Sequence, residues 1–239
     1  AFTEATLPGN EKGLYVGVVI RPKIGWQMAA YADFYQSPFL KYRVSGPSRG
    51  WDYLVQLTHT PNRQSEIYLR YRIENKPINE ADAGTVLHFP PDKPKQNLRL
   101  HFSSRVSSLL TVKARVEMVW INRQKASGEE GFLSFLELSS GALGKWRGNV
   151  RLQYFETDSY DSRIYAYESD VLYSYTIPAF FEKGFRYYLN ISFESTKRLQ
   201  FWVRLAQTVF PDRNSIGSGL DEIQGNRRTE VRLQLKFLL

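Results

Sequence analysis

The segment from Arg227 to Leu239 constrains the fold more than any other part of the chain. From Val231 to Phe237 its apolar and polar side chains alternate: Val231, Leu233, Leu235 and Phe237 against Arg232, Gln234 and Lys236, and Leu239 keeps the apolar parity. A period of two is typical of a β-strand with one apolar face and one polar face. A two-faced strand of about nine to eleven residues also has the length that crosses a bilayer in a transmembrane β-barrel. The segment therefore predicts a membrane-crossing strand with a basic inner face.

The same alternation recurs along the rest of the chain. It predicts about eleven strands, near residues 13–21, 26–35, 51–57, 67–73, 98–102, 112–120, 132–138, 150–154, 185–193, 199–205 and 231–239. No segment shows the 3.6-residue period of a helix. We therefore predict an all-β fold, an antiparallel up-and-down transmembrane β-barrel region over residues 1–239. A soluble β-sandwich also alternates and is kept as the alternative.

Two features favour a barrel in lipid over a sandwich. The predicted strands are long and uniformly two-faced, and aromatic residues gather near their ends, as in the girdles of membrane barrels. These aromatic residues are Trp26, Phe34, Trp51, Trp120, Tyr154 and Phe237. The longest apolar run, Leu14 to Ile20, is far shorter than the ~20 residues of a spanning helix, which excludes a helical membrane protein. We expect the chain in the bacterial outer membrane, in contact with its lipids.

Short and long connections alternate along the chain. The short ones lie near Pro22, Pro61, Ser107, Gly144 and Thr196, and the long ones span 37–49, 75–94, 122–130 and 210–226. In outer-membrane barrels the short turns face the periplasm and the long loops face outward. This alternation requires that segment 157–184 contain either no crossing strand or two. Because the segment is polar, we predict one large extracellular loop at about 157–184 that folds over or into the pore and has room for a short hairpin.

The strand count leads to a prediction about closure. Single-chain bacterial barrels normally have an even number of strands, whereas about eleven are predicted here. The first and the last predicted strands both run toward the periplasm, so they do not suit one another as antiparallel neighbours. We therefore expect the chain to be part of a larger even-stranded barrel that is completed by upstream strands or by a partner chain.

Four segments carry a family resemblance. They are Tyr160-Asp161-Ser162-Arg163-Ile164-Tyr165-Ala166-Tyr167-Glu168-Ser169-Asp170-Val171-Leu172-Tyr173, Ile216-Gly217-Ser218-Gly219-Leu220-Asp221-Glu222-Ile223-Gln224-Gly225-Asn226, Gly50-Trp51-Asp52-Tyr53 and Thr60-Pro61-Asn62-Arg63. Together they resemble the C-terminal barrel region of a Bacteroidota outer-membrane family. Members of that family look like large proteins with N-terminal helix-hairpin-helix segments. This sequence shows no such segment, so the resemblance does not carry a nucleic-acid partner over to its residues.

Basic side chains share the parity opposite to the apolar ones. The predicted lumen-lining set is Arg70, Arg72, Arg99, Lys113, Arg115, Arg151, Arg186, Arg204, Arg232 and Lys236. These residues are expected to face the lumen, because charge on the lipid face costs about 2–4 kcal/mol at the membrane midplane. They either form salt-bridge networks that fill the interior, with Glu66, Glu117, Glu194 and Glu230, or line a path for anionic solutes.

Loop acids and histidines give weaker signals. Glu156, Asp158 and Asp161, or Asp212, Asp221 and Glu222, are candidates for a calcium site, but neither set matches a defined calcium motif, and solvated loop acids are the favoured interpretation. A further alternative is that these acids pair with lumen arginines and pin the long loop inside. The three histidines, His59, His88 and His101, share no metal-ligand spacing, so neither a metal site nor a catalytic triad is expected.

The sequence as a whole predicts a non-enzymatic outer-membrane β-barrel without a cofactor. It would act as a porin-like pore, a transport component or a secretion-assembly component with a basic lumen. Two alternatives are kept. One is a soluble all-β carbohydrate-binding module. The other is an outer-membrane lipase-type barrel, for which His59 has the lipid-facing parity but lacks an obvious neighbouring serine.

Overall fold

A computed structural model describes residues 10–39, 44, 46–77, 92–123 and 128–238. Within it, eleven long strands form one antiparallel sheet in chain order. The strands are β1 (Lys12–Lys23), β2 (Trp26–Ser37), β3 (Ser48–Asn62), β4 (Ser65–Asn75), β5 (Lys95–Arg105), β6 (Leu110–Ile121), β7 (Glu129–Leu143), β8 (Trp146–Thr157), β11 (Lys183–Thr196), β12 (Leu199–Val209) and β15 (Arg227–Phe237). The predicted number and positions of the long strands are confirmed. Each predicted strand lies inside an observed one, except that the last ends at Phe237.

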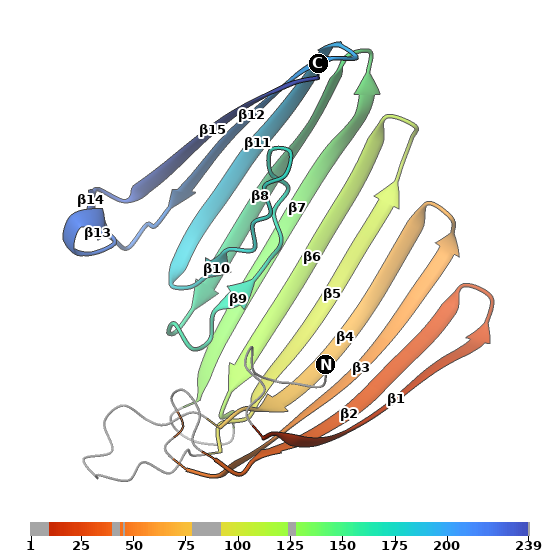
Figure 1. Cartoon of the computed structure of the whole chain (residues 1–239), viewed down its shortest axis with the longest axis vertical. Helices are drawn as coiled ribbons and strands as arrows, with labels where there is room; N and C mark the ends of the chain where they lie inside the picture. The colour runs from red at the N-terminus through yellow and green to blue at the C-terminus, as the bar shows by residue number, and fades with distance from the viewer. Residues whose placement is uncertain (1–9, 40–43, 45, 78–91, 124–127, 239) are drawn as a thin grey trace.

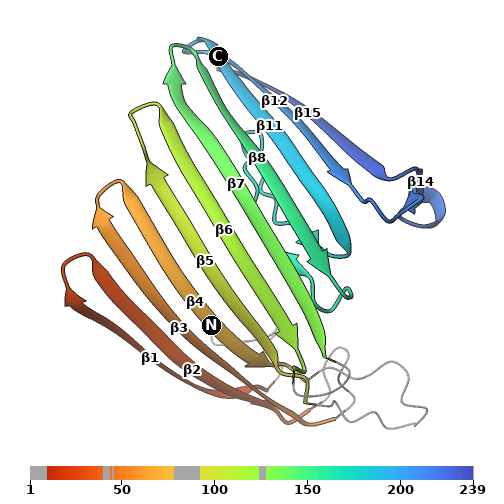
Figure 2. The same cartoon turned by 180° about the vertical axis from the view of Figure 1, so that it is seen from behind.

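The sheet curves like a trough, and segment 158–182 lies on its concave side (Figures 1 and 2). We call this concave side the inner face and the opposite side the outer face. Four two-residue strands lie outside the sheet: β9 (Ile164–Tyr165) pairs with β10 (Ala179–Phe180), and β13 (Ser215–Ile216) pairs with β14 (Ile223–Gln224). The helical structure in the described residues is a single 3-10 turn at Gly219–Asp221, and no helix among them is long and apolar enough to span a membrane.

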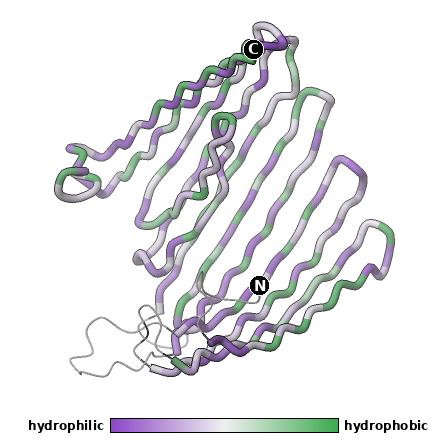
Figure 3. Tube along the Cα trace, viewed as in Figure 1, coloured by the Kyte–Doolittle hydropathy of each residue, from purple (hydrophilic) through white to green (hydrophobic). Residues whose placement is uncertain are grey.

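Side chains alternate between the two faces along every long strand, and hydropathy alternates with them (Figure 3). The outer face is apolar and uncovered. In β8, β12 and β15 its residues Leu152, Leu205 and Leu233 are 62%, 46% and 74% exposed. Soluble monomers rarely expose an apolar area larger than a few hundred Å². An apolar band across a whole sheet is what a bilayer requires of a barrel wall.

Aromatic rings border the outer face at both ends of the strands. At the end with long loops, Phe34 packs against Tyr53 with ring centroids 5.5 Å apart, and Tyr154 packs against Phe185 at 5.0 Å. At the end with short turns, the Trp146 ring centroid lies 4.4 Å from that of Phe193. The ends of the strands thus carry two aromatic belts, with aliphatic side chains between them, which agrees with the predicted girdle.

Connections of two to four residues join the strands at one end of the sheet, and longer ones join them at the other (Figure 1). The alternation is as predicted. Three of the turns lie slightly later than the residues that marked them, because Pro22, Pro61 and Thr196 belong to β1, β3 and β11. The β3–β4 turn is made by Arg63 and Gln64. Pro61 sits where the β3–β4 register shifts, between His59 and Asn62, which is a place where a missing N–H is tolerated.

Two edges of the sheet have no neighbouring strand in the described structure. β1 pairs only with β2, and β15 pairs only with β12. All of β1 is exposed on both faces. Both edge strands run from the loop end to the turn end, because β1 leads into a short turn and β15 follows a long loop. An antiparallel ladder between them is therefore excluded by direction.

Candidate functional site

Segment 158–182, which we call the inward loop, forms the candidate site. It leaves β8, crosses the inner face of β7, β8 and β11, and returns to β11 (Figure 1). No strand in it joins the main sheet; its regular structure is the β9–β10 pair, the short hairpin that the prediction allowed. It lies over the inner face of the sheet, and that it enters a pore stays a prediction. That this end of the sheet is extracellular stays a prediction.

Apolar packing holds the first part of the inward loop. Ile164 and Ala166 are buried together with Phe180 in one cluster, against residues of the sheet: Val119, Ile121, Leu133, Phe135 and Phe155. Gly131 on β7 makes this approach feasible, because a Cβ atom there would lie 2.5 Å from the carbonyl oxygen of Ser162. The loop backbone therefore lies directly on the sheet at this point.

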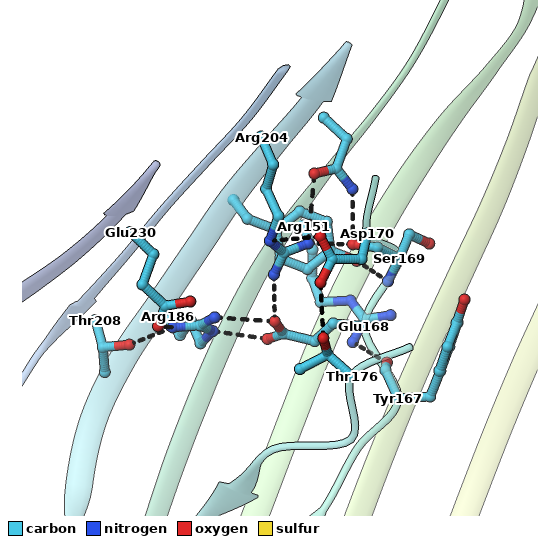
Figure 4. A network of polar contacts seen from close by, with 12 residues as sticks. Arg151, Tyr167, Glu168, Ser169, Asp170, Thr176, Arg186, Arg204, Thr208 and Glu230 are labelled. Atoms are coloured by element: carbon cyan, nitrogen blue, oxygen red, sulfur yellow. Dashed lines mark hydrogen bonds and ion pairs between the residues drawn. The ribbon is translucent and has the colours of Figure 1, made fainter. Parts of the chain in front are cut away.

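Glu168 is the central ionic anchor of the loop (Figure 4). Its side chain is fully buried and accepts hydrogen bonds from Nε and Nη2 of Arg186, at 2.7 and 3.0 Å. Nη2 of Arg204 donates to the same carboxylate. Arg186 also donates to Thr208 at 2.7 Å and to Glu230 at 3.2 Å. The two arginines are 6% and 1% exposed, so one loop carboxylate pairs with two buried cations, one from β11 and one from β12.

Asp170 forms a second anchor, two residues further on. Its buried carboxylate pairs with Arg232 of β15 and lies 3.8 Å from Nε of Arg204. Thr176 donates a hydrogen bond to it at 2.7 Å. Arg204 and Arg232 are directly opposite one another in the β12–β15 ladder. Like charges in that position repel, so Asp170 relieves a repulsion that the sheet contains.

Loop carbonyl groups complete the attachment. Ser169 accepts hydrogen bonds from Arg204 and, at 2.7 Å, from Nδ2 of Asn190. Tyr167 accepts one at 2.7 Å from Arg151, whose guanidinium also donates to the buried Glu137. The inward loop is therefore held through its backbone as well as through its carboxylates.

Acid pH is expected to loosen the Asp170 anchor. Burial opposes ionisation of Asp170, but hydrogen bonds from Thr176 and Val171 and the charges of Arg204 and Arg232 outweigh it and hold the pKa below its ordinary value. An aspartate whose pKa is lower in the folded state stabilises that state above the unfolded value, about 3.9, and loses this contribution as the pH falls through the folded value. We expect constant docking from pH 8 down to about 5, a stabilisation that begins to weaken below the unfolded value, and release only as the pH falls through the lower folded value.

The chain has no cysteine, which makes this prediction measurable. A spin label on Tyr175→Cys, a loop position that is 74% exposed, should become mobile on acidification. The Asp170→Asn variant should lose the acid-dependent part of this change. A label whose mobility follows pH equally in both proteins would contradict the assignment.

The predicted basic residues all lie on the inner face, but they divide into groups. Arg151, Arg186, Arg204 and Arg232 bind the inward loop. Three others pair within the sheet: Arg72 with Asp52, Arg99 with Glu117 at 2.8 Å, and Lys113 with Glu137 at 3.4 Å. The rest are more loosely held: Arg70 donates to Gln56, Arg115 lies 3.8 Å from Glu117, and Lys236 lies 5.8 Å from the ring centroid of Tyr173. Contact of any of them with an anion stays a prediction.

The acids that were predicted to pin the loop were the wrong ones. Asp158 accepts a hydrogen bond from the backbone of Glu130, and Asp161 is 69% exposed and 3.9 Å from Arg163. Asp221 and Glu222 are exposed at the 3-10 turn. Among the described residues, no group of three or more His, Asp or Glu side chains is placed to hold a metal ion. Calcium binding by the loop acids stays a prediction.

Glu168 and Asp170 were missed in the sequence as the acids that anchor the inward loop. Glu137 of β7 was also missed as the partner of Arg151 and Lys113. In the sequence, the first two read only as charges that interrupt a strand. The signal that points to them is their spacing: Glu168 and Asp170 share a parity in an extended segment, as the arginines do in theirs. His59, the lipase candidate, lies on the outer face, stacked on Trp26 with ring centroids 4.2 Å apart. His88 lies outside the described residues.

The sheet is antiparallel and up-and-down. Its outer face is apolar with two aromatic belts, and its polar inner face holds a long loop. These features are typical of the wall of a membrane β-barrel. The comparisons agree. The structure resembles that of the copper transporter OprC, with a TM-score of 0.50, 13% sequence identity, and coverage of 94% of this chain and 42% of that chain. The chain thus spans less than half the length of that transporter. At this identity the likeness shows the fold of an outer-membrane barrel.

No protein-family model matches the sequence, and no curated protein matches it. The resemblance to a Bacteroidota outer-membrane family therefore stays a prediction.

Proposed function

We propose that this chain forms part of the wall of a non-enzymatic bacterial outer-membrane barrel through which solutes pass. The observation that carries the proposal is the contrast between the two faces of the sheet. The outer face presents exposed leucines between two aromatic belts, while the inner face buries Arg186 and Arg204 beneath the inward loop. A membrane protein needs that outer face, and a filled, charged interior is typical of a barrel lumen.

The inward loop would narrow the lumen. It occupies the inner face of β7, β8 and β11, held by two buried carboxylates and by backbone contacts. Loops that fold into a barrel restrict which solutes pass. With Arg151, Arg186, Arg204 and Arg232 engaged by the loop or its neighbours, the most loosely held of the predicted lumen residues are Arg70, Arg115 and Lys236. We infer that these three side chains favour anionic solutes.

Closure would come from strands outside the described sheet. An open edge does not survive in lipid, because its N–H and C=O groups find no partners there. β1 and β15 run in the same direction, so an antiparallel closure needs an odd number of additional strands. These would belong to another segment of a longer polypeptide or to a partner chain.

Extraction and electrophoresis test the proposal. We expect the protein from bacterial membranes to require detergent and to migrate faster on a denaturing gel when the sample is not boiled, because a closed barrel resists detergent at room temperature. In planar bilayers the purified protein should conduct ions. A protein that stays in solution without detergent would instead favour the carbohydrate-binding module, and lipid hydrolysis abolished by His59→Ala would favour the lipase.

A further inference from the structure

A cavity of about 440 Å³ lies between the inward loop and the last strands of the sheet. Its volume falls within the ~300–1,000 Å³ range of small-molecule sites. Its walls come from β8, β11, β12, β15, the returning part of the inward loop and the β12–β15 connection, so it depends on all of them being in place. It lies on the inner face, whereas a closing strand would pair with β15 in the plane of the sheet.

One wall of the cavity is aromatic. Phe155 and Phe180 are 1% and 4% exposed, with ring centroids 5.2 Å apart, and Phe210 packs against Phe155 at 5.9 Å. All three rings line the cavity, and the first two belong to the buried cluster that fixes the loop. The wall is therefore rigid and apolar.

The cavity is also lined by charged side chains. The lining residues include four arginines and two glutamates: Arg186, Arg213, Arg228 and Arg232, with Glu182 and Glu230. Two of the arginines are committed elsewhere. Arg186 donates through all three of its nitrogens, to Glu168, Thr208 and Glu230, and Arg213 makes a two-point contact with Glu182.

The other two arginines retain donors. Nε of Arg228 lies 3.6 Å from Glu230, and Nη2 of Arg232 lies 3.8 Å from the same side chain, both beyond hydrogen-bond distance. Nη1 of Arg232 is engaged by Asp170. Glu230 is thus shared by three arginines, since it also accepts from Arg186. Five arginines (Arg186, Arg204, Arg213, Arg228 and Arg232) thus meet four carboxylates (Glu168, Asp170, Glu182 and Glu230), and five minus four leaves one net positive charge beside the cavity.

We propose that this cavity binds a small organic anion that carries an aromatic ring, with its ring against Phe155, Phe180 and Phe210 and its carboxylate on Arg228 and Arg232. Apolar walls with a few convergent polar groups are the usual composition of a ligand site, and guanidinium is the side chain best suited to a carboxylate. The inference deepens the proposed function, because it assigns a solute class to the same inner face.

Binding can be measured directly with 4-fluorobenzoate, followed by fluorine NMR line broadening on the detergent-solubilised protein. The uncharged 4-fluorobenzamide reports partition into micelles and onto the outer face. We expect saturable binding of the acid and not of the amide. Arg228→Gln, a change at a side chain that is 58% exposed, should weaken binding about tenfold, the usual effect of losing a charge-assisted hydrogen bond.

Two controls make the outcome decisive. Arg228→Lys should keep most of the affinity because it keeps the charge, and Arg227→Gln, on the outer-face parity of the same strand, should change nothing. Equal binding of acid and amide, or an unchanged affinity in Arg228→Gln, would overturn the site. So would inorganic phosphate that competes as well as the aromatic acid. Binding without conductance would support the binding site and contradict the transport proposal. Conductance without binding would support the transport proposal and contradict the binding site.

Discussion

Replacing Glu168 by alanine should free the inward loop and destabilise the protein by about 3–5 kcal/mol, the range measured when one partner of a buried ion pair is removed. The substitution leaves Arg186 and Arg204 buried without their shared carboxylate. In the proposed barrel it should also raise the single-channel conductance, because the loop no longer narrows the lumen. Thermal loss of the fast-migrating gel form measures the stability, and planar-bilayer recording measures the pore.

Two matched variants separate the ionic anchor from general loop damage. Asp161→Ala removes an exposed acid of the same loop and should leave both readouts unchanged. Glu168→Gln keeps the shape and some hydrogen bonds and should fall between alanine and wild type. A Glu168→Ala protein that melts and conducts like wild type would show that the apolar cluster alone holds the loop.

A charge on the outer face should have a comparable effect. Val55 lies in the middle of β3, 47% exposed, between Ala30 and Tyr71 on the neighbouring strands. Arginine at this depth in a bilayer costs about 2–4 kcal/mol. We expect Val55→Arg to lower the yield of assembled protein in membranes and to lower the temperature at which the folded gel form is lost.

The control for this charge lies one residue away on the inner face. Gln56 already accepts a hydrogen bond from Nε of Arg70 at 2.7 Å, so Gln56→Glu places a charge at the same depth beside a cation. It should be neutral or mildly stabilising. If Val55→Arg and Gln56→Glu behave alike, the outer face does not contact lipid, and a soluble sandwich becomes the better description.

The strands of the sheet were predictable because the alternation of apolar and polar residues is a property of each strand by itself. The parity of residues such as Leu152 and Arg151 follows from their place in an extended strand, and every long strand obeys it. The hairpin pairs followed from the short turns, since consecutive strands joined by two to four residues pair with one another, and the order of the hairpins followed from the up-and-down barrel class. Closure and curvature of the sheet depend on how strands pair over the whole barrel, so they did not follow from the alternation within single strands.

The loop anchors were less predictable because they depend on contacts between distant parts of the chain. Glu168 meets Arg204 across 36 positions, and Asp170 meets Arg232 across 62. The sequence indicated that acids would meet lumen arginines, but not which ones. Which acids meet the arginines depends on where Ile164 and Phe180 pack against the sheet. That packing cannot be inferred from the alternation of apolar and polar residues.

The shared direction of β1 and β15 also limits how two copies of the protein can pair through their sheet edges. Two copies inserted in the same orientation present only edges that run the same way, so no antiparallel ladder can form between them. The exposed backbone of β1 therefore cannot form an antiparallel ladder with another copy in the same orientation. It remains open to a strand of the opposite direction, and misassembly would require a copy inserted upside down.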